Sequence, residues 1–151
     1  MKLRHQRFVT EIRRKVEAGD REAQYDLALC YEQGKFGVVR DAEKAFEWFK
    51  RGADNNEVAC VSEVAYCYAS GHGVTENGSL ALLYFAKGAD LGSKLCCYAM
   101  ASAFETGDDT LGLDVDEAEA RTFYTLLFTR CSEDDLPRTN LEYAKQWLRD
   151  N

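Results

Sequence analysis

Residues 23–34 read AQYDLALCYEQG, and the same pattern returns at residues 60–71 as CVSEVAYCYASG and at residues 96–107 as CCYAMASAFETG. The second copy begins 37 residues after the first, and the third begins 36 residues after the second. In each copy an apolar residue and an alanine precede an aromatic residue, which stands three positions before a glycine. Similarity at a fixed period predicts a chain assembled from copies of one supersecondary unit.

A second repeated stretch follows each of these copies. Residues 41–54 read DAEKAFEWFKRGAD, and residues 77–90 read NGSLALLYFAKGAD. The third copy keeps four of the same positions: Asp116, Ala120, Phe123 and Tyr124. Apolar side chains recur at intervals of three, four and seven or eight residues, which is the spacing of a helix with one buried face. We therefore predict that each unit is a pair of α-helices.

Capping residues mark the ends of the predicted helices. A glycine is expected to close the first helix of each unit in the left-handed conformation that glycine favours. These glycines are Gly34, Gly71 and Gly107. A residue with a short polar side chain is expected to cap the start of the second helix. These N-caps are Asp41, Asn77 and Asp116.

The repeats predict one all-α domain over residues 1–151, in the form of a short α/α solenoid. A single helix pair cannot bury its apolar stripe, so consecutive pairs must stack on one another. The predicted parts are an N-terminal helix at 4–20, repeat 1 at 21–56, repeat 2 at 57–92, repeat 3 at 93–131 and a C-terminal capping helix at 136–150. The ends of such a stack also offer surfaces through which copies can form an oligomer.

Composition indicates an ordinary globular protein. The chain has 151 residues, of which 46% are hydrophobic and 30% are charged, and its formal net charge is −7. No run approaches the roughly 18 apolar residues of a membrane-spanning helix. Charged residues throughout the first twenty positions also argue against a secretory signal. We therefore expect a cytoplasmic protein with no membrane span.

The charge is unevenly distributed along the chain. Residues 1–21 hold seven basic and three acidic residues, a local charge of +4, which leaves −11 for the remainder. The acidic balance argues against nucleic acid as a partner, because a phosphate backbone requires clustered Lys and Arg. The basic N-terminal helix is either a second partner site or a solvated helix face.

The repeated pattern resembles Sel1-like repeats, which are related to the tetratricopeptide repeats. Ala-x-x-x-Leu-Ala-x-x-Tyr-x-x-Gly, followed by Gly-Val-x-x-Asp-x-x-x-Ala-x-x-Trp-Phe-x-x-Gly-Ala, carries the resemblance, which extends from Arg21 to Phe128. The third copy departs from it in a longer loop at 107–113 and in Leu127-Phe128, where Gly-Ala is usual. The resemblance implies a protein-binding adaptor or scaffold, with no particular chemistry and no cofactor.

By analogy with the tetratricopeptide arrangement, the resemblance places the first helix of each unit on the concave wall of the solenoid. Nine residues are then expected to face a partner-binding groove: Tyr25, Leu29, Glu32, Ser62, Tyr66, Ala69, Tyr98, Ser102 and Glu105. Tyrosine offers a large, stiff contact surface with a polar tip. The glutamates favour a basic partner, bound as a helix or an extended peptide. Alternatively, some of these tyrosines pack between neighbouring units.

Six cysteines and His72 prompt two other hypotheses: a hydrolase-type enzyme, and a thiol-based redox module built on the adjacent Cys96 and Cys97. We expect free thiols, because the chain is long enough to fold without disulfides and has no export signal. No His or Cys pair has the spacing of a zinc site, and the acidic residues at 108–117 do not match a calcium-binding loop. The sequence therefore predicts no catalytic, metal-binding or cofactor-binding residue.

Overall fold

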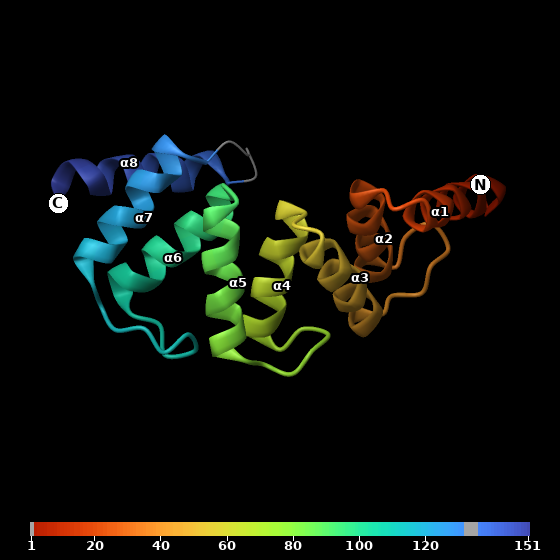
Figure 1. The fold of residues 1–151 in the computed structure, drawn as a ribbon, viewed down its shortest axis with the longest axis horizontal. Helices are drawn as coiled ribbons and strands as arrows, with labels where there is room; N and C mark the ends of the chain where they lie inside the picture. The colour runs from red at the N-terminus through yellow and green to blue at the C-terminus, as the bar shows by residue number, and fades with distance from the viewer. Residues whose placement is uncertain (1, 132–135) are drawn as a thin grey trace. The chain divides into compact units, whose positions relative to one another are not determined.

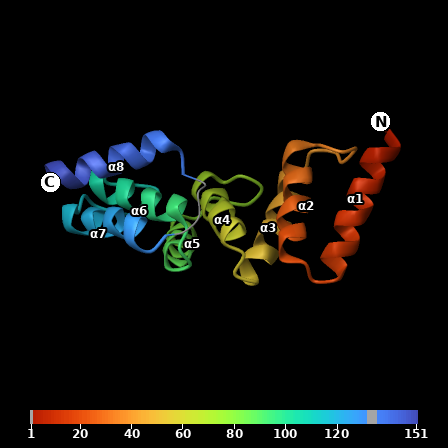
Figure 2. The ribbon, with the colours of Figure 1, turned by 90° about the horizontal axis from the view of Figure 1, so that it is seen from above.

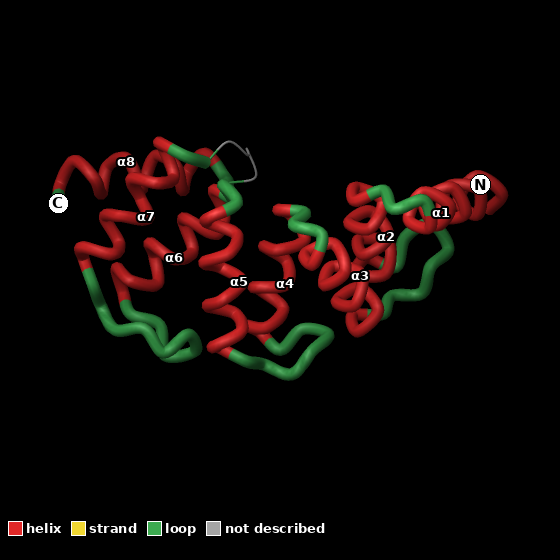
Figure 3. The backbone as a smooth tube through the Cα atoms, in the orientation of Figure 1, coloured by secondary structure: helices red, strands yellow, loops and turns green. Residues whose placement is uncertain are grey.

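The computed structural model describes residues 2–131 and 136–151, and these residues form eight α-helices (Figure 1). The helices are α1 (Lys2–Glu17), α2 (Arg21–Gln33), α3 (Ala42–Asp54), α4 (Val58–Ser70), α5 (Gly78–Asp90), α6 (Lys94–Thr106), α7 (Glu117–Thr129) and α8 (Arg138–Asp150). Turns and loops connect them, and within these ranges the only extended pairing is a single bridge between Asp108 and Leu113 (Figure 3). The prediction of an all-α chain of paired helices is confirmed.

Backbone contacts divide the chain into two compact units, residues 1–76 and residues 77–151. The first unit contains α1 to α4, and the second contains α5 to α8. Within each unit, helices that follow one another in the sequence pack against one another, as α1 and α2 do in Figure 2. Each unit is therefore held together by contacts between sequence neighbours, as expected for a repeat fold. None of the described helices has the length and apolar character needed to cross a membrane.

The three predicted N-caps are confirmed. Asp41, Asn77 and Asp116 all have extended backbone conformations, and each side chain accepts a hydrogen bond of 3.0 Å from a backbone N–H of the first helical turn. This bond satisfies one of the donors that a helix leaves free at its start. Asp20 and Ser93 cap α2 and α6 in the same way over 3.2 Å.

The N-terminal helix ends earlier than the predicted residue 20. It stops at Glu17, because Asp20 leaves the helical conformation to cap α2. Gly19 makes the intervening turn with a φ of +84°, a conformation that costs glycine little. The buried face of α1 contains Val9 and Ile12, whose side chains are 7% and 4% exposed.

Two of the three predicted helix-closing glycines are confirmed. Gly34 and Gly71 lie in the left-handed region with φ values of 63° and 69°. The prediction for Gly107 was wrong, because its φ of 76° is combined with a ψ of 153°. The chain after Gly107 does not turn back over the helix end. Instead, Asp108 and Leu113 exchange backbone hydrogen bonds of 2.8 and 2.9 Å and close a small loop.

The core of the first unit lies along the contacts of α3 with α2 and α4. Its most deeply buried side chains include Leu27, Ala28, Phe49, Val61, Val64 and Ala65. Gly52 sets the approach of α3 to α4, since a Cβ atom built on it would lie 2.3 Å from the Sγ of Cys60. The two helices therefore touch at a point where no larger residue fits.

In the second unit, α8 packs on α7 through aromatic side chains. Tyr124 and Leu127 of α7 are fully buried, and Ala144 and Trp147 of α8 are also buried. The ring centroids of Tyr124 and Trp147 are 5.0 Å apart. The last helix thus covers apolar surface that α7 would otherwise expose.

Candidate functional site

Six of the nine predicted groove residues lie in the first unit, on α2 and α4. Tyr25, Leu29 and Glu32 are spaced by four and three positions along α2, so they share one face of that helix, and all three are half-buried. On α4, Tyr66 is 39% exposed and Ala69 is half-buried. These five side chains retain surface that a partner can contact.

Two of the predicted residues in this unit have a packing role. Ser62 is 4% exposed, and its hydroxyl donates a hydrogen bond of 3.1 Å to the carbonyl of Val58 one turn earlier. It therefore offers almost no surface to a partner. The ring of Tyr25 lies against Phe49 of α3 with centroids 5.8 Å apart, so this tyrosine packs within its own repeat while remaining partly open.

Glu32 is engaged inside the first unit. Its carboxylate oxygens lie 3.0 Å from the Nε2 of His72, which follows the end of α4. The guanidinium of Arg40 lies 3.6 Å from the same carboxylate and also donates to the Glu32 carbonyl over 2.9 Å. Glu32 and His72 thus link α2 to the loop after α4. The sequence did not indicate this pair, because the two residues are 40 positions apart.

The other three predicted residues lie on α6 in the second unit. Tyr98, Ser102 and Glu105 have the same spacing of four and three as the residues on α2, and all three are half-buried. The ring of Tyr98 packs edge to face against Tyr124 of α7, with centroids 6.0 Å apart. Both predicted tyrosines at this register, Tyr25 and Tyr98, therefore contact the second helix of their own repeat.

Glu105 is likewise engaged inside its own unit. Its carboxylate accepts hydrogen bonds from the hydroxyls of Tyr124 and of Tyr143 on α8. Burial and the bond to Glu105 raise the pKa of Tyr124. The separate hydrogen bond that Tyr143 donates to Glu105, aided by desolvation, raises the pKa of Tyr143 to about 12. Both glutamates of the predicted groove therefore have intramolecular partners, which weakens the argument for a basic partner.

The cysteines are placed as packing residues. Five of the six are buried, and burial raises the pKa of both Cys60 and Cys67 to about 12. A nucleophilic cysteine needs the opposite shift, because the thiolate is the reactive form. Cys97 lies with its Sγ 3.0 Å from the Sγ of Cys131, a residue that follows α7. The close sulfur pair is thus Cys97 with Cys131, whereas the sequence pointed to Cys96 with Cys97.

The acidic loop after α6 is organised by its own hydrogen bonds. A side-chain oxygen of Asp108 accepts from the backbone N–H of Leu111 over 3.0 Å, and Asp116 caps α7. In the part of the chain that the structure describes, no three His, Cys, Asp or Glu side chains are grouped so that they could hold a metal ion.

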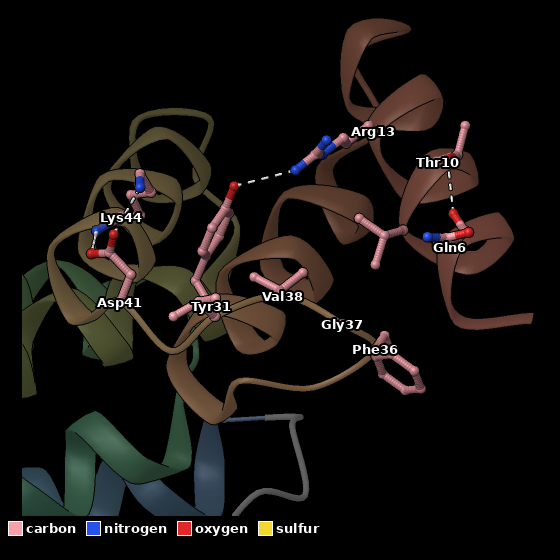
Figure 4. Close-up of a pocket in the computed structure, with 11 residues that line it drawn as sticks. Gln6, Thr10, Arg13, Tyr31, Phe36, Gly37, Val38, Asp41 and Lys44 are labelled. Carbon is pink, nitrogen blue, oxygen red and sulfur yellow. Dashed lines mark hydrogen bonds and ion pairs between the residues drawn. The ribbon is translucent and has the colours of Figure 1, made fainter. Parts of the chain in front are cut away.

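A groove that the sequence did not predict runs along α1 in the first unit (Figure 4). It has a volume of about 640 Å³. One wall is a face of α1 formed by Gln6, Val9, Thr10 and Arg13. The facing wall includes Tyr31 at the end of α2, Phe36 and Val38 in the following loop, and Asp41 and Lys44 at the start of α3. We call this feature the α1 groove. The one feature of the sequence that pointed to this groove was the basic character of the N-terminal helix.

Comparison with known proteins agrees with the repeat architecture. The Sel1 repeat model matches residues 21–57, 59–93 and 94–127. Two curated relatives come from Schizosaccharomyces pombe: chitin synthase regulatory factor 2, 38% identical over 71 residues, and chitin synthase regulatory factor 3, 27% identical over 128 residues. The alignments cover 47% and 83% of this chain but only 14% and 13% of the relatives, so the chain spans a small part of their length.

Two solved structures share the fold. A Sel1 repeat protein from Oxalobacter formigenes aligns over 96% of this chain and 99% of its own, with a TM-score of 0.76 and 22% sequence identity. A protective antigen of uropathogenic Escherichia coli with an SLR fold aligns over 77% of this chain and 24% of its own, with a TM-score of 0.69 and 28% identity. With three matched repeats that together cover most of its length, the chain belongs to the Sel1 repeat family.

Proposed function

We propose that this chain is a protein-binding adaptor that holds a segment of a partner protein against the first helices of its repeats. Sel1-repeat proteins are generally protein-interaction scaffolds, and their fold is generally not enzymatic. In the first unit the contact surface consists of Tyr25, Leu29 and Glu32 on α2 and of Tyr66 and Ala69 on α4. In the second unit it consists of Tyr98, Ser102 and Glu105 on α6.

The exposure of Tyr66 is the observation that supports this proposal most strongly. Its neighbours on α4, Ala65 and Cys67, are buried, whereas Tyr66 itself is 39% exposed. A tyrosine contributes a large contact area with few rotatable bonds, and tyrosine is enriched where proteins bind one another. Its half-exposed ring is therefore suited to anchor a partner. The carboxylates contribute less, because Glu32 and Glu105 are already hydrogen-bonded within the chain.

The curated relatives suggest the kind of process that such an adaptor serves. Their names describe factors that regulate chitin synthase. The chain spans only 14% and 13% of these relatives. We therefore take the binding role from the repeat family and leave the regulated enzyme with the relatives.

We also propose that the chain works in the cytoplasm. Five buried cysteines pack as free thiols, and free thiols persist in reducing compartments. Fractionation of cells that express the tagged chain should recover it with cytosolic markers. Recovery in a secreted or oxidising compartment would contradict this proposal.

Site-specific crosslinking tests the contact surface. A photoreactive phenylalanine analogue in place of Tyr66 should crosslink to a protein in a lysate of the source cells. The same analogue in place of Leu83, which is 61% exposed on α5, should not crosslink to that protein. The captured protein is then purified, and its affinity for the wild-type chain is compared with that for Tyr66→Ala and Leu83→Ala.

We expect Tyr66→Ala to weaken binding about tenfold or more, as loss of an interface anchor does, while Leu83→Ala binds like the wild type. Circular dichroism must show the same helical content for all three proteins. Equal crosslinking from both positions, or unchanged affinity of Tyr66→Ala, would reject this surface.

A further inference from the structure

We propose that the α1 groove is a second binding site, which takes an extended acidic segment of a partner protein with an apolar residue between two carboxylates. The site uses none of the eight residues of the proposed contact surface. It lies entirely within the first unit. Its success or failure is therefore independent of the function proposed above.

The size of the groove suits a few side chains of a peptide. Its volume of about 640 Å³ lies within the range of roughly 300–1,000 Å³ that is usual for binding sites. A second hollow of about 320 Å³ adjoins it along α1, shares Gln6 and Thr10 with it, and adds Leu3 and Arg7. The two hollows form a continuous track along the helix, which favours a chain-like ligand over a compact one.

The charges along this track are unbalanced. Its two carboxylates are already paired: Asp41 lies 2.8 Å from the Nζ of Lys44, and Glu11 lies 2.7 Å from the guanidinium of Arg14. Arg7 and Arg13, by contrast, have no carboxylate partner within residues 2–131 and 136–151. The track thus presents two guanidinium groups without counter-charges. Guanidinium groups bind carboxylates through paired, charge-assisted hydrogen bonds.

Apolar side chains line the hollow that contains Arg13. Val9 forms part of the α1 wall and is 7% exposed, and the half-buried Val38 faces it from the loop. Tyr31 closes one end, where its hydroxyl lies 3.5 Å from the Arg13 guanidinium and its ring centroid lies 5.9 Å from the Nζ of Lys44 (Figure 4). An aliphatic side chain next to the carboxylate that binds Arg13 would therefore contact apolar surface.

The loop wall of the groove is preformed. Phe36 and Gly37 both have positive φ values, 57° and 82°, and the ring of Phe36 packs on Phe8 with centroids 4.3 Å apart. The backbone N–H of Asp41 donates to the carbonyl of Tyr31 over 2.9 Å, which fixes the far end of the loop. A preformed wall lowers the ordering cost of binding.

The spacing of the arginines sets the spacing of the ligand charges. Arg7 and Arg13 are six residues apart on one helix, which corresponds to about 9 Å along its axis. An extended peptide rises roughly 3.3 Å per residue, so about three residues span this distance. The expected ligand therefore carries acidic residues at positions i and i+3 with an aliphatic residue between them.

A protein segment fits this site better than a nucleic acid does. Two guanidiniums neutralise few phosphates, and the chain outside residues 1–21 carries a charge of −11 that repels a long polyanion. The apolar residues beside Arg13 also match a peptide side chain better than a sugar-phosphate backbone.

Fluorescence anisotropy with a defined probe tests the proposal. The probe is a fluorescein-labelled peptide, Gly-Ser-Glu-Ser-Leu-Glu-Ser, and its matched controls replace both Glu by Gln or Leu by Ser. The full chain should bind the acidic probe, and either replacement in the peptide should weaken binding about fivefold to tenfold. Binding should also weaken as salt is added, since the contacts are ionic.

Variants of α1 separate a specific site from general charge attraction. Arg13→Gln and Arg7→Gln should each weaken binding about tenfold, and Arg13→Lys should weaken it less than Arg13→Gln. Arg4→Gln is the matched control, because it removes the same charge from the same helix at a residue that lines neither hollow. It should bind within about twofold of the wild type.

Several results would overturn the proposal. These are equal losses for Arg4→Gln and Arg13→Gln, equal binding of the Gln-substituted peptide, or no binding of the acidic probe up to about 1 mM. Tighter binding of a single-stranded oligonucleotide of equal charge would assign the site to nucleic acid instead. Self-association in sedimentation that Arg13→Gln abolishes, without competition by the probe, would assign it to a second copy of this chain.

Discussion

The carboxylate of Glu105 on α6 accepts a hydrogen bond from the hydroxyl of Tyr124 on α7 across 2.7 Å. Tyr124 is fully buried, and the same carboxylate also accepts from Tyr143 on α8. One acidic side chain thus connects three successive helices of the second unit. A residue that the repeat pattern places on a binding surface is therefore also a structural link.

Removal of this link should change how a tyrosine ionises. The bond to Glu105 raises the pKa of Tyr143 to about 12 from an ordinary value of 10.0. Because the folded state holds this proton more tightly than the unfolded state does, the resulting stabilisation is complete below about pH 10 and is lost as the pH rises through about 12. In Glu105→Gln, ultraviolet titration of tyrosinate should show the pKa of Tyr143 moving down toward 10, and the pKa of Tyr124 should also fall while burial keeps it raised.

Tyr143→Phe and Tyr124→Phe serve as controls for this titration. Tyr143→Phe should remove the tyrosine that ionises near pH 12, while Tyr124→Phe should lower the free energy of unfolding by about 1–2 kcal/mol through loss of a bond to a charged group. If Tyr143→Phe removes a tyrosine that ionises near pH 10, the bond to Glu105 does not form in solution.

Trp147 should hold α8 on the second unit. Its side chain is 9% exposed and packs on the buried ring of Tyr124. Trp147→Ala should therefore lower the free energy of unfolding by about 3–5 kcal/mol, and hydrogen exchange should show faster exchange in α8 than in α6. Trp147→Phe keeps a ring at this position and should retain most of the protection. Unchanged exchange in α8 of Trp147→Ala would contradict the packing described above.

Gly52 should resist substitution because of a neighbouring helix. A Cβ atom at this position would lie 2.3 Å from the Sγ and 2.9 Å from the Cβ of Cys60. Gly52→Ala gains about 1 kcal/mol of helix propensity, but the overpacking costs about 1–3 kcal/mol, so we expect a net loss of stability in thermal unfolding.

Gly19→Ala is the matched comparison, since Gly19 has no heavy atom within 4 Å of its Cβ position and has a φ of +84°. It should lose about 1 kcal/mol through backbone strain alone. A Gly52→Ala variant that melts above the wild type would show that α3 and α4 are not in close contact at Cys60.

Thiol labelling tests the arrangement of the cysteines. Cys131 is half-buried and the other five are buried, so the native protein should expose one fast-reacting thiol to an aromatic disulfide reagent. Cys131→Ser should abolish the fast phase. After denaturation, six thiols should react. A denatured count of four would instead reveal a disulfide, for which the closest pair described above is Cys97 with Cys131.

Local sequence signals predicted the helices and most of their ends. Asp41, Asn77 and Asp116 cap α3, α5 and α7 as predicted, because a capping side chain bonds to a backbone N–H two or three residues away. Gly107 was the exception. Its ψ depends on the bridge between Asp108 and Leu113, a pairing that the repeat pattern does not encode.

The same local signals predicted the binding surface less well than they predicted the helices. Helical spacing placed Glu32 on a face of α2, but it did not reveal that His72 lies 3.0 Å away. The same reasoning counted Ser62 as a surface residue, although its position on α4 is 4% exposed. Position along one helix fixes a face, whereas the neighbouring helices determine how much of that face remains open.

The sequence by itself therefore determined the helix pairs, their period and their caps, because these features arise from interactions within a few residues. Only the tertiary structure decided which partners Glu32 and Glu105 have, which sulfur atoms lie together, and that a groove lined by Arg13 runs along α1 beside a hollow lined by Arg7. Those features depend on distances between side chains that are far apart in the sequence. Such distances are set by the packing of whole helices against one another.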